Sequence, residues 1–128
     1  MENNLTVLIC DDSILIRKKL RSLLEKCKCK EISEAVNGQV AVELVKAQKP
    51  DLVFMDIVMP EKDGIEALRE SMTFDPNTKV VMASSVGTND CLKEALRYGA
   101  YDFIQKPLSF EAITSIIEKV LKEGKVDV

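Results

Sequence analysis

Histidine is absent from this sequence, and cysteine is scarce. The four cysteines include only one closely spaced pair, Cys27 and Cys29, which offers too few soft ligands for a zinc centre, so we expect reduced thiols. No apolar run approaches the roughly 20 residues that a membrane-spanning helix needs. These absences argue against a zinc protein and against a membrane protein.

A dominant charge is missing too. The chain carries 18 basic and 21 acidic residues in mixed order, for a net charge of −3 at pH 7. Such a chain presents no basic field that would hold the phosphate backbone of a nucleic acid. The amino-terminal residues are polar and include Glu2, unlike the basic start of a secretory leader. We therefore expect a cytoplasmic protein without direct nucleic-acid binding.

Linkers and low-complexity stretches are also lacking, and 128 residues suit one hydrophobic core. Five short β-rich runs alternate with five segments of helical periodicity, which predicts an α/β fold. The predicted strands cover residues 6–10, 31–36, 52–55, 79–83 and 101–105. We expect a single domain over residues 1–128.

The segments after these runs repeat apolar residues at helical spacing. The first shows the pattern most fully, with one face formed by Ile16, Leu20, Leu23, Leu24 and Cys27. Leu96 and Phe110 are expected on the apolar sides of the fourth and fifth helices. Ser109 is predicted to cap the start of the fifth helix, and Gly99 and Gly124 are predicted to end the fourth and fifth.

Polarity divides the predicted strands into two groups. The first, third and fourth are apolar throughout, as parallel strands covered on both faces are, whereas the second and fifth are mixed, as edge strands can be. The order 2-1-3-4-5 places the apolar strands in the middle and keeps the crossovers right-handed. We therefore predict a flavodoxin-like, doubly wound, five-stranded parallel sheet with five helices.

Polar residues directly follow four of the predicted strands: Asp11 and Asp12, then Asp56, Ser84 and Lys106. In an open α/β sheet, ligands bind beyond the carboxyl ends of the strands, where these side chains would gather. Three carboxylates at one place repel one another unless a cation lies between them. Hard oxygen ligands favour Mg²⁺, with Mn²⁺ as a substitute, and Mg²⁺ commonly recruits a phosphate oxygen.

Such a site suits phosphoryl transfer. Asp56 can attack phosphorus to give an acyl phosphate, and the transfer mainly needs alignment and neutralisation of charge. Lys106 can supply a fixed positive charge, and Ser84 can supply a hydroxyl donor.

The chain contains the segments LICDDS, FMDIVMPEKDG, VMASS and GAYDFIQKP. In these segments it resembles the receiver domains of two-component response regulators. The resemblance covers nearly the whole chain. It implies that Asp56 is the phosphoacceptor and that Ser84 and Lys106 complete the reaction site. It also implies that the metal is held by Asp11, Asp12, Asp56 and the backbone carbonyl of Val58.

The resemblance further implies a two-state switch. Phosphorylated Asp56 attracts the Ser84 hydroxyl and Phe103 turns inward, so the signal appears on the face formed by the fourth helix, fifth strand and fifth helix. A cis peptide bond is implied between Lys106 and Pro107. Val58 and Val86 flank the site, and we expect their apolar side chains to hinder the attacking water and prolong the phosphorylated state.

The expected partners come from the same resemblance. A sensor histidine kinase or a phosphotransfer protein would supply the phosphoryl group, and a target protein would bind the switched face, as in chemotaxis or a phosphorelay. A dimer that forms on phosphorylation is compatible with residues such as Arg97, Tyr98 and Lys119. We expect a phosphoacceptor switch rather than an enzyme, promoting only its own phosphorylation and dephosphorylation.

Three other functions share parts of this pattern. A flavin-binding electron carrier would need an anion-binding loop after the first strand, where Asp11 and Asp12 would repel a phosphate. A magnesium-dependent phosphatase that forms an aspartyl phosphate would place a second acid two residues after Asp56, where this chain has Val58. A receiver-like interaction module that is never phosphorylated would not need the complete set of acids, hydroxyl and lysine.

Overall fold

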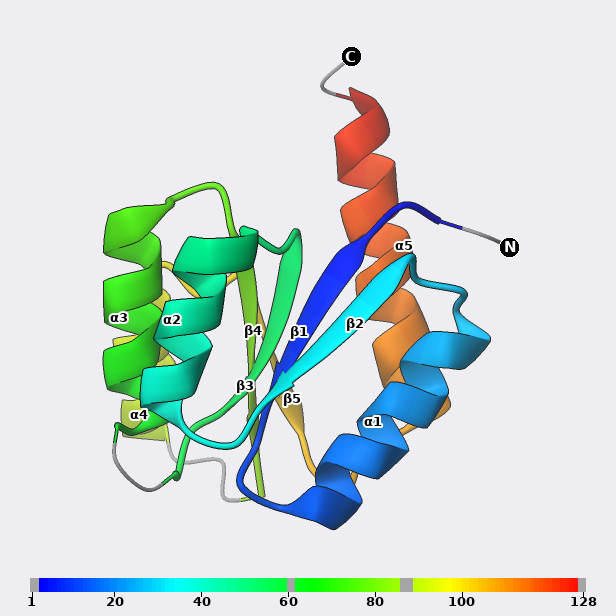
Figure 1. Ribbon diagram of the computed structural model, residues 1–128. Coiled ribbons are helices and arrows are strands. Elements are labelled where there is room, and N and C mark those ends of the chain that lie inside the picture. The colour runs from blue at the N-terminus through cyan, green and yellow to red at the C-terminus, as the bar shows by residue number, and fades with distance from the viewer. Residues whose placement is uncertain (1–2, 60–61, 86–88, 127–128) are drawn as a thin grey trace.

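The predicted alternation of strands and helices is confirmed. The computed structural model describes residues 3–59, 62–85 and 89–126. The elements along the chain (Figure 1) are β1 (Thr6–Cys10), α1 (Ile14–Lys26), β2 (Glu31–Ala35), α2 (Gly38–Gln48), β3 (Leu52–Asp56), α3 (Gly64–Phe74), β4 (Lys79–Ser84), α4 (Asn89–Arg97), β5 (Asp102–Gln105) and α5 (Phe110–Val126). No helix in these described ranges is long and apolar enough to cross a membrane.

The five strands are parallel and lie in the order β2-β1-β3-β4-β5, as predicted. The register aligns the carboxyl ends of the inner strands. Cys10 lies opposite Met55, Asp56 lies opposite Ala83, and Ser84 lies opposite Gln105. The residues that follow these strands therefore emerge at one edge of the sheet, at the bottom of Figure 1.

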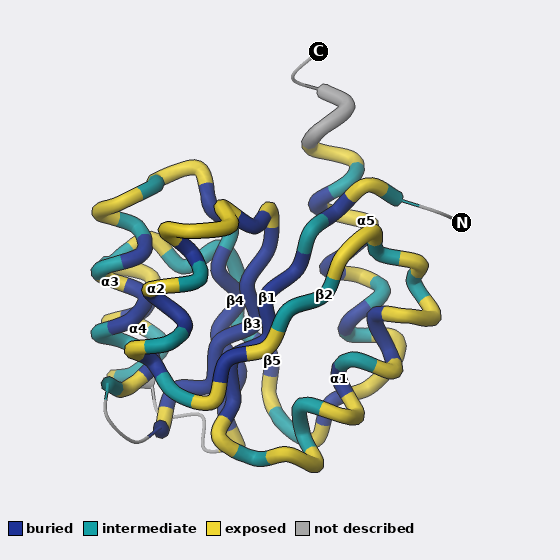
Figure 2. Tube along the Cα trace, in the orientation of Figure 1, coloured by how far each residue is buried: buried dark blue, intermediate teal, exposed yellow. Residues whose placement is uncertain are grey.

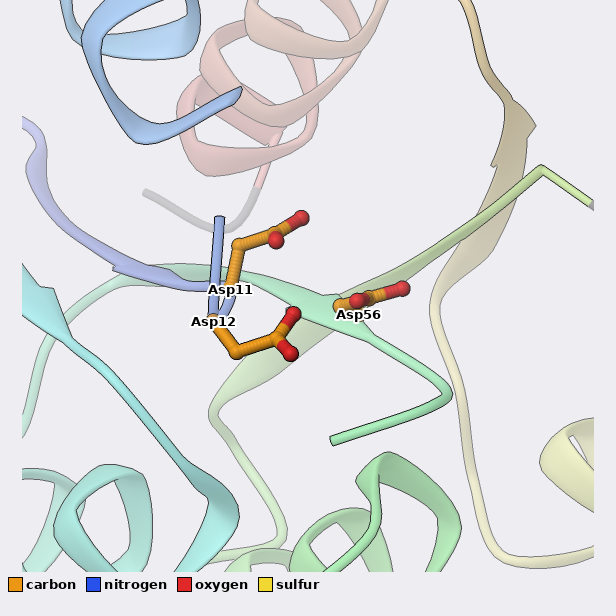
Figure 3. Close-up of side chains that lie close together, drawn as sticks. All are labelled: Asp11, Asp12 and Asp56. Carbon is orange, nitrogen blue, oxygen red and sulfur yellow. The ribbon is translucent and has the colours of Figure 1, made fainter. Parts of the chain in front are cut away.

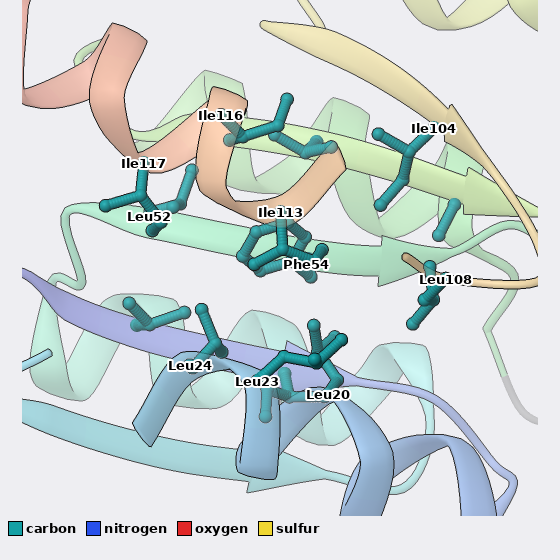
Figure 4. Close-up of a cluster of buried hydrophobic side chains, with 14 of the residues drawn as sticks. Leu20, Leu23, Leu24, Leu52, Phe54, Ile104, Leu108, Ile113, Ile116 and Ile117 are labelled. Carbon is teal, nitrogen blue, oxygen red and sulfur yellow. The ribbon is translucent and has the colours of Figure 1, made fainter. Parts of the chain in front are cut away.

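Helices cover both faces of the sheet, with α1 and α5 on one face and α2, α3 and α4 on the other (Figure 1). Successive strand residues point to opposite faces, so Phe54 packs in the α1 and α5 layer whereas Met55 packs in the other. In the first layer (Figure 4), Phe54 shares a cluster with Leu24 of α1 and Ile113 of α5. The central strands are buried, and the outer faces of the helices are exposed (Figure 2). This packing holds the strand ends in fixed positions.

Polar caps fix where the helices begin beside that edge. Ser13 accepts a hydrogen bond from the Ile16 N–H at the start of α1, and Asn37 and Asp63 cap α2 and α3 in the same way. Ser109 accepts from the Ala112 N–H at 3.1 Å, which confirms the predicted cap of α5.

Several details differ from the sequence-based predictions. Gly124 does not end α5, which continues to Val126; an interior glycine costs only about 1 kcal/mol relative to alanine. Gly99 does follow the end of α4, with a φ of 97° that favours glycine. Leu96 and Phe110 were expected on apolar faces but are 55% and 43% exposed. Leu96 follows the buried Ala95, so its side chain points away from the narrow face of α4 that packs against the rest of the protein.

Candidate functional site

Three carboxylates meet at the carboxyl edge of the sheet. Asp11 and Asp12 directly follow β1, and Asp56 is the last residue of the neighbouring β3. One carboxylate oxygen from each lies within 4.8 Å of the others, and Figure 3 shows the side chains gathered there. Asp11 and Asp56 are buried, at 3% and 8% exposed, whereas Asp12 is exposed. We call this cluster the acidic pocket, and Asp12 forms its exposed side.

Lys106 brings a positive charge into this pocket from the end of β5. Its Nζ donates to Asp11 Oδ2 at 2.7 Å and lies 3.4 Å from Asp56 Oδ1, with its side chain 14% exposed. The Lys106 backbone N–H donates to the Ser84 carbonyl at 2.8 Å, which ties this segment to β4. The bond between Lys106 and Pro107 is cis, as predicted.

Asp11 is held through both its backbone and its carboxylate. Its N–H donates to the Ala35 carbonyl at 3.2 Å, and its Oδ1 accepts from the Ser13 N–H at 2.9 Å. Arg17 Nη1 donates to its carbonyl oxygen at 2.8 Å. The orientation of this buried acid is therefore fixed before any ligand binds.

The charges in the pocket are not balanced. Burial, followed by the negative charge of Asp11, raises the pKa of Asp56, and Lys106 only partly opposes this. Burial lowers the pKa of Lys106, but its hydrogen bond to Asp11 and the charge of Asp56 outweigh burial, so its pKa is raised overall. One lysine does not neutralise three carboxylates, and a cation in the pocket would lower the repulsion.

The acidic cluster fits a hard divalent cation. Its ligand atoms are carboxylate oxygens, which suit Mg²⁺ or Mn²⁺ far better than zinc. Asp12 leaves one side of the cluster open to solvent, which provides a route of entry. The described residues offer no other group of three or more acidic, cysteine or histidine side chains close enough together to hold a metal.

The segment after β3 is held against the sheet by close backbone packing. The Gly64 N–H donates to the Ile57 carbonyl at 2.7 Å, and a Cβ at Gly64 would lie 2.0 Å from the Asp56 carbonyl oxygen. A Cβ at Gly38 would lie 2.0 Å from the Lys62 carbonyl oxygen. Val58 lies in this segment and is 75% exposed. Gly38 of α2 and Gly64 of α3 therefore both leave the space in which the backbone near the Val58 carbonyl packs.

Cys10 joins the same region to the start of α2. Its thiol donates to the Asn37 carbonyl at 3.3 Å and lies 3.2 Å from Met59 Sδ. Burial, together with the charges of Asp11 and Asp56, raises the pKa of Cys10 to about 12, so the thiol stays protonated and able to donate. This cysteine has a packing role.

The remaining predicted residues lie at or near the edge. Ser84 is the last residue of β4 and is 5% exposed. Phe103 in β5 is half-buried and packs against the cluster formed with α2, α3 and α4. Val86 lies outside the described residues. The sequence-based predictions did not include Arg17 or Gly38. The position of Arg17, one turn into the first helix, was the available signal, because a long side chain there can reach back to the end of the preceding strand.

The sequence matches the family model described as the response regulator receiver domain over residues 7–118. It is 42% identical to the chemotaxis protein CheY of Thermotoga maritima over 116 residues, which cover 91% of this chain and 97% of that protein. It is 40% identical to CheY of Bacillus subtilis over 115 residues, which cover 90% of this chain and 96% of that one.

Solved structures agree with this match. The response regulator domain of Thermotoga maritima CheB is 37% identical, with a TM-score of 0.81 over 94% of this chain and 96% of that one. A chain in the CheX–CheY–BeF3–Mg²⁺ complex from Borrelia burgdorferi is 35% identical, with a TM-score of 0.87 over 91% of this chain and 89% of that one.

Proposed function

Because this chain belongs to the response regulator receiver domains of two-component signalling, we propose that Asp56 is its phosphoacceptor. Residues 1–128 would form one receiver domain that changes its binding face when Asp56 is phosphorylated. The observation that carries the proposal is the position of Asp56 at the end of a central strand, between two further acids and Lys106. The chemotaxis proteins and the response regulator domain that this chain resembles do not favour a phosphatase or an unphosphorylated module.

The transfer itself needs one nucleophile. An Asp56 carboxylate oxygen attacks the phosphorus of a phosphohistidine on a sensor kinase or phosphotransfer protein. An O–P bond forms as the P–N bond breaks, and the histidine nitrogen leaves with the bonding electrons and takes up a proton. Burial and the neighbouring acids raise the pKa of Asp56, and a neutralised pocket keeps the carboxylate ionised for attack.

The other residues neutralise and orient. Lys106 holds a positive charge 3.4 Å from Asp56, where an added phosphoryl oxygen would also meet it. Mg²⁺, when held by Asp11, Asp12, Asp56 and the Val58 carbonyl, would supply the remaining positive charge next to the phosphoryl oxygens. Mn²⁺ would serve the same purpose. These groups act on Asp56 alone, so we propose self-catalysed phosphorylation and dephosphorylation without a separate enzymatic substrate.

Phosphorylation would be read out through β4 and β5. The Ser84 hydroxyl would turn to the new phosphoryl oxygens, and Phe103 would move further into the protein, changing the surface of α4, β5 and α5. A target protein would bind this changed face, and the phosphorylated chain could dimerise there. We place these events in the cytoplasm, where ATP, the ultimate phosphoryl source, is available to the kinase.

The test uses acetyl phosphate as a small phosphoryl donor in the presence of Mg²⁺. Intact mass spectrometry should show one added phosphoryl group on the wild-type chain and none on Asp56→Asn. Asp90→Asn, which changes an exposed acid on α4, is the matched control and should be labelled like the wild type. Labelling of Asp56→Asn to the wild-type extent would overturn the assignment of the acceptor.

A further inference from the structure

Arg17 connects the acidic pocket to the outer edge of the sheet. It lies one turn into α1, and its side chain is only 12% exposed. Its Nη1 donates to the Asp11 carbonyl oxygen at 2.8 Å, while its Nε donates to Glu34 Oε1 at 3.0 Å. Glu34 belongs to the edge strand β2. One guanidinium thus joins the end of β1 to the neighbouring strand.

Arg17 is itself held in place. The second oxygen of Glu34 accepts from Arg21 Nε at 2.6 Å, and Arg21 Nη2 donates to the Ile32 carbonyl at 3.0 Å. The hydrogen bond from Arg21, and then that from Arg17, lowers the pKa of Glu34, so this carboxylate remains ionised between the two arginines at neutral pH. A charged network with planar donors restricts the Arg17 side chain to one orientation.

The carbonyl that Arg17 contacts lies in the peptide unit between Asp11 and Asp12. The two Cα atoms belong to the same rigid planar unit, so a displacement of that peptide would carry both side chains with it. Lys106 also holds Asp11, but a cation bound by the carboxylates would compete with Lys106 for Asp11 Oδ2. The Arg17 contact is made to the backbone carbonyl, so it does not compete with such a cation and would remain.

We propose that Arg17 is a positioning residue for the cation site: it anchors the peptide between Asp11 and Asp12, and Glu34 anchors Arg17. This inference rests on the cation part of the proposed function. It makes cation affinity depend on two residues of α1 and β2, and β2 is the edge strand opposite to β5. A change at Glu34 should therefore reach the pocket through Arg17.

Charge alone leads to the opposite expectation. Arg17 carries a positive charge beside the carboxylates, and removing a like charge should strengthen the binding of Mg²⁺. If Arg17 positions the ligands, its removal should weaken binding, because residues that orient metal ligands commonly contribute about 10- to 100-fold to affinity. The direction of the change separates the two effects.

The experiment is a calorimetric titration of the metal-free protein with Mg²⁺ alone. We expect Arg17→Met to bind Mg²⁺ about 10-fold or more weakly than the wild type. Arg17→Lys keeps the charge but has a single nitrogen for two acceptors, so its affinity should fall between the two. Arg21→Met is the matched control: it removes the same charge and a contact to the same Glu34, but Arg21 does not contact Asp11.

Equal or tighter binding by Arg17→Met would overturn the proposal, as would an equal loss of affinity in Arg21→Met. Circular dichroism checks that each variant folds; if Arg17→Met does not, Arg17→Lys and Glu34→Gln carry the test, and wild-type affinity in both would overturn it. If the wild-type chain binds no Mg²⁺, the proposed cation site is wrong, and the role of Arg17 is wrong with it. If Asp56 is not labelled but Mg²⁺ binds normally, only the assignment of Asp56 as the acceptor is wrong.

Discussion

Lys106 lies closer to Asp11 than to Asp56: its Nζ is 2.7 Å from Asp11 Oδ2 and 3.4 Å from Asp56 Oδ1. The lysine therefore shares its charge between the buried carboxylate of Asp11 and the residue that we propose as the acceptor. Removing it would leave the Asp11 and Asp56 carboxylates without the cation that pairs with them directly.

We expect Lys106→Met to destabilise the metal-free protein by about 1–3 kcal/mol, because loss of one partner leaves buried charges unpaired. Mg²⁺ should restore much of this loss by binding the same carboxylates. Urea unfolding with and without Mg²⁺ measures both effects. Lys119→Met is the control; its pair with Asp102 is exposed and should contribute at most about 1 kcal/mol. Similar losses in the two variants would count against a special role of Lys106.

Asp56→Asn should be more stable than the wild type in the absence of metal at neutral pH. Burial and the charge of Asp11 raise the pKa of Asp56 above its unfolded value, so the native state favours the protonated acid. Ionisation costs the wild type stability as pH rises from about 4, the unfolded pKa of an aspartate, through the raised native pKa. The advantage of the variant should be complete above that window and disappear below about pH 4.

Unfolding by urea at several pH values checks this pH dependence. Asp51→Asn is a suitable control, because Asp51 is an exposed acid near the opposite end of β3, where it accepts from Thr6. An Asp56→Asn variant that is less stable than the wild type at pH 7 would contradict the expectation. Mg²⁺ should also stabilise Asp56→Asn less than the wild type, since one ligand has lost its charge.

Gly38→Ala should move the segment that carries Val58. The added Cβ would lie 2.0 Å from the Lys62 carbonyl oxygen, and backbone cannot yield as a flexible side chain does. We expect a loss of about 1–3 kcal/mol in the free energy of unfolding together with weaker Mg²⁺ binding. Gln39→Ala, at the next and exposed position of α2, should change stability by no more than about 0.5 kcal/mol. Normal stability and Mg²⁺ affinity in Gly38→Ala would show that the segment can shift freely.

Val58→Asn tests whether an apolar side chain beside Asp56 slows hydrolysis of the acyl phosphate. Val58 is 75% exposed, so the change should leave folding intact. A polar side chain there could hold the attacking water, and lowering the barrier by about 1 kcal/mol would shorten the half-life roughly fivefold. Loss of the added mass over time, after removal of acetyl phosphate, measures the half-life. An unchanged half-life in Val58→Asn, and in the double change with Val86→Asn, would rule out this effect.

The strand order and the acidic pocket could be predicted because their signals are local. Asp11, Asp56 and Lys106 each come directly after a β-rich run, and parallel strands bring such positions to one edge. Asp12 follows Asp11 directly and belongs to the same cluster, although it is exposed whereas Asp11 is buried. For these residues, the position directly after a β-rich run is enough to predict the position in the folded sheet.

Other features depend on how elements pack, which periodicity does not describe. Leu96 and Phe110 fit apolar faces, but the structure covers only part of each face. Gly124 resembles a helix terminator, yet α5 passes through it. The contact of Arg17 with Asp11 requires α1 to lie over the junction of β1 and β2, and the closeness of Gly38 to Lys62 requires α2 to meet the segment after β3. The Gly38 contact leaves no recognisable spacing in the chain, and the only signal for the Arg17 contact is the position of Arg17 one turn into the first helix.

The contact between Lys106 and Asp11 joins residues that are 95 positions apart. During synthesis on a ribosome, the acids after β1 emerge long before the lysine that partly neutralises them. A nascent chain that ends before β5 would carry the carboxylates without that lysine and could not assemble the reaction site. The site that we propose to receive a phosphoryl group is thus completed late, once β5 has joined the sheet.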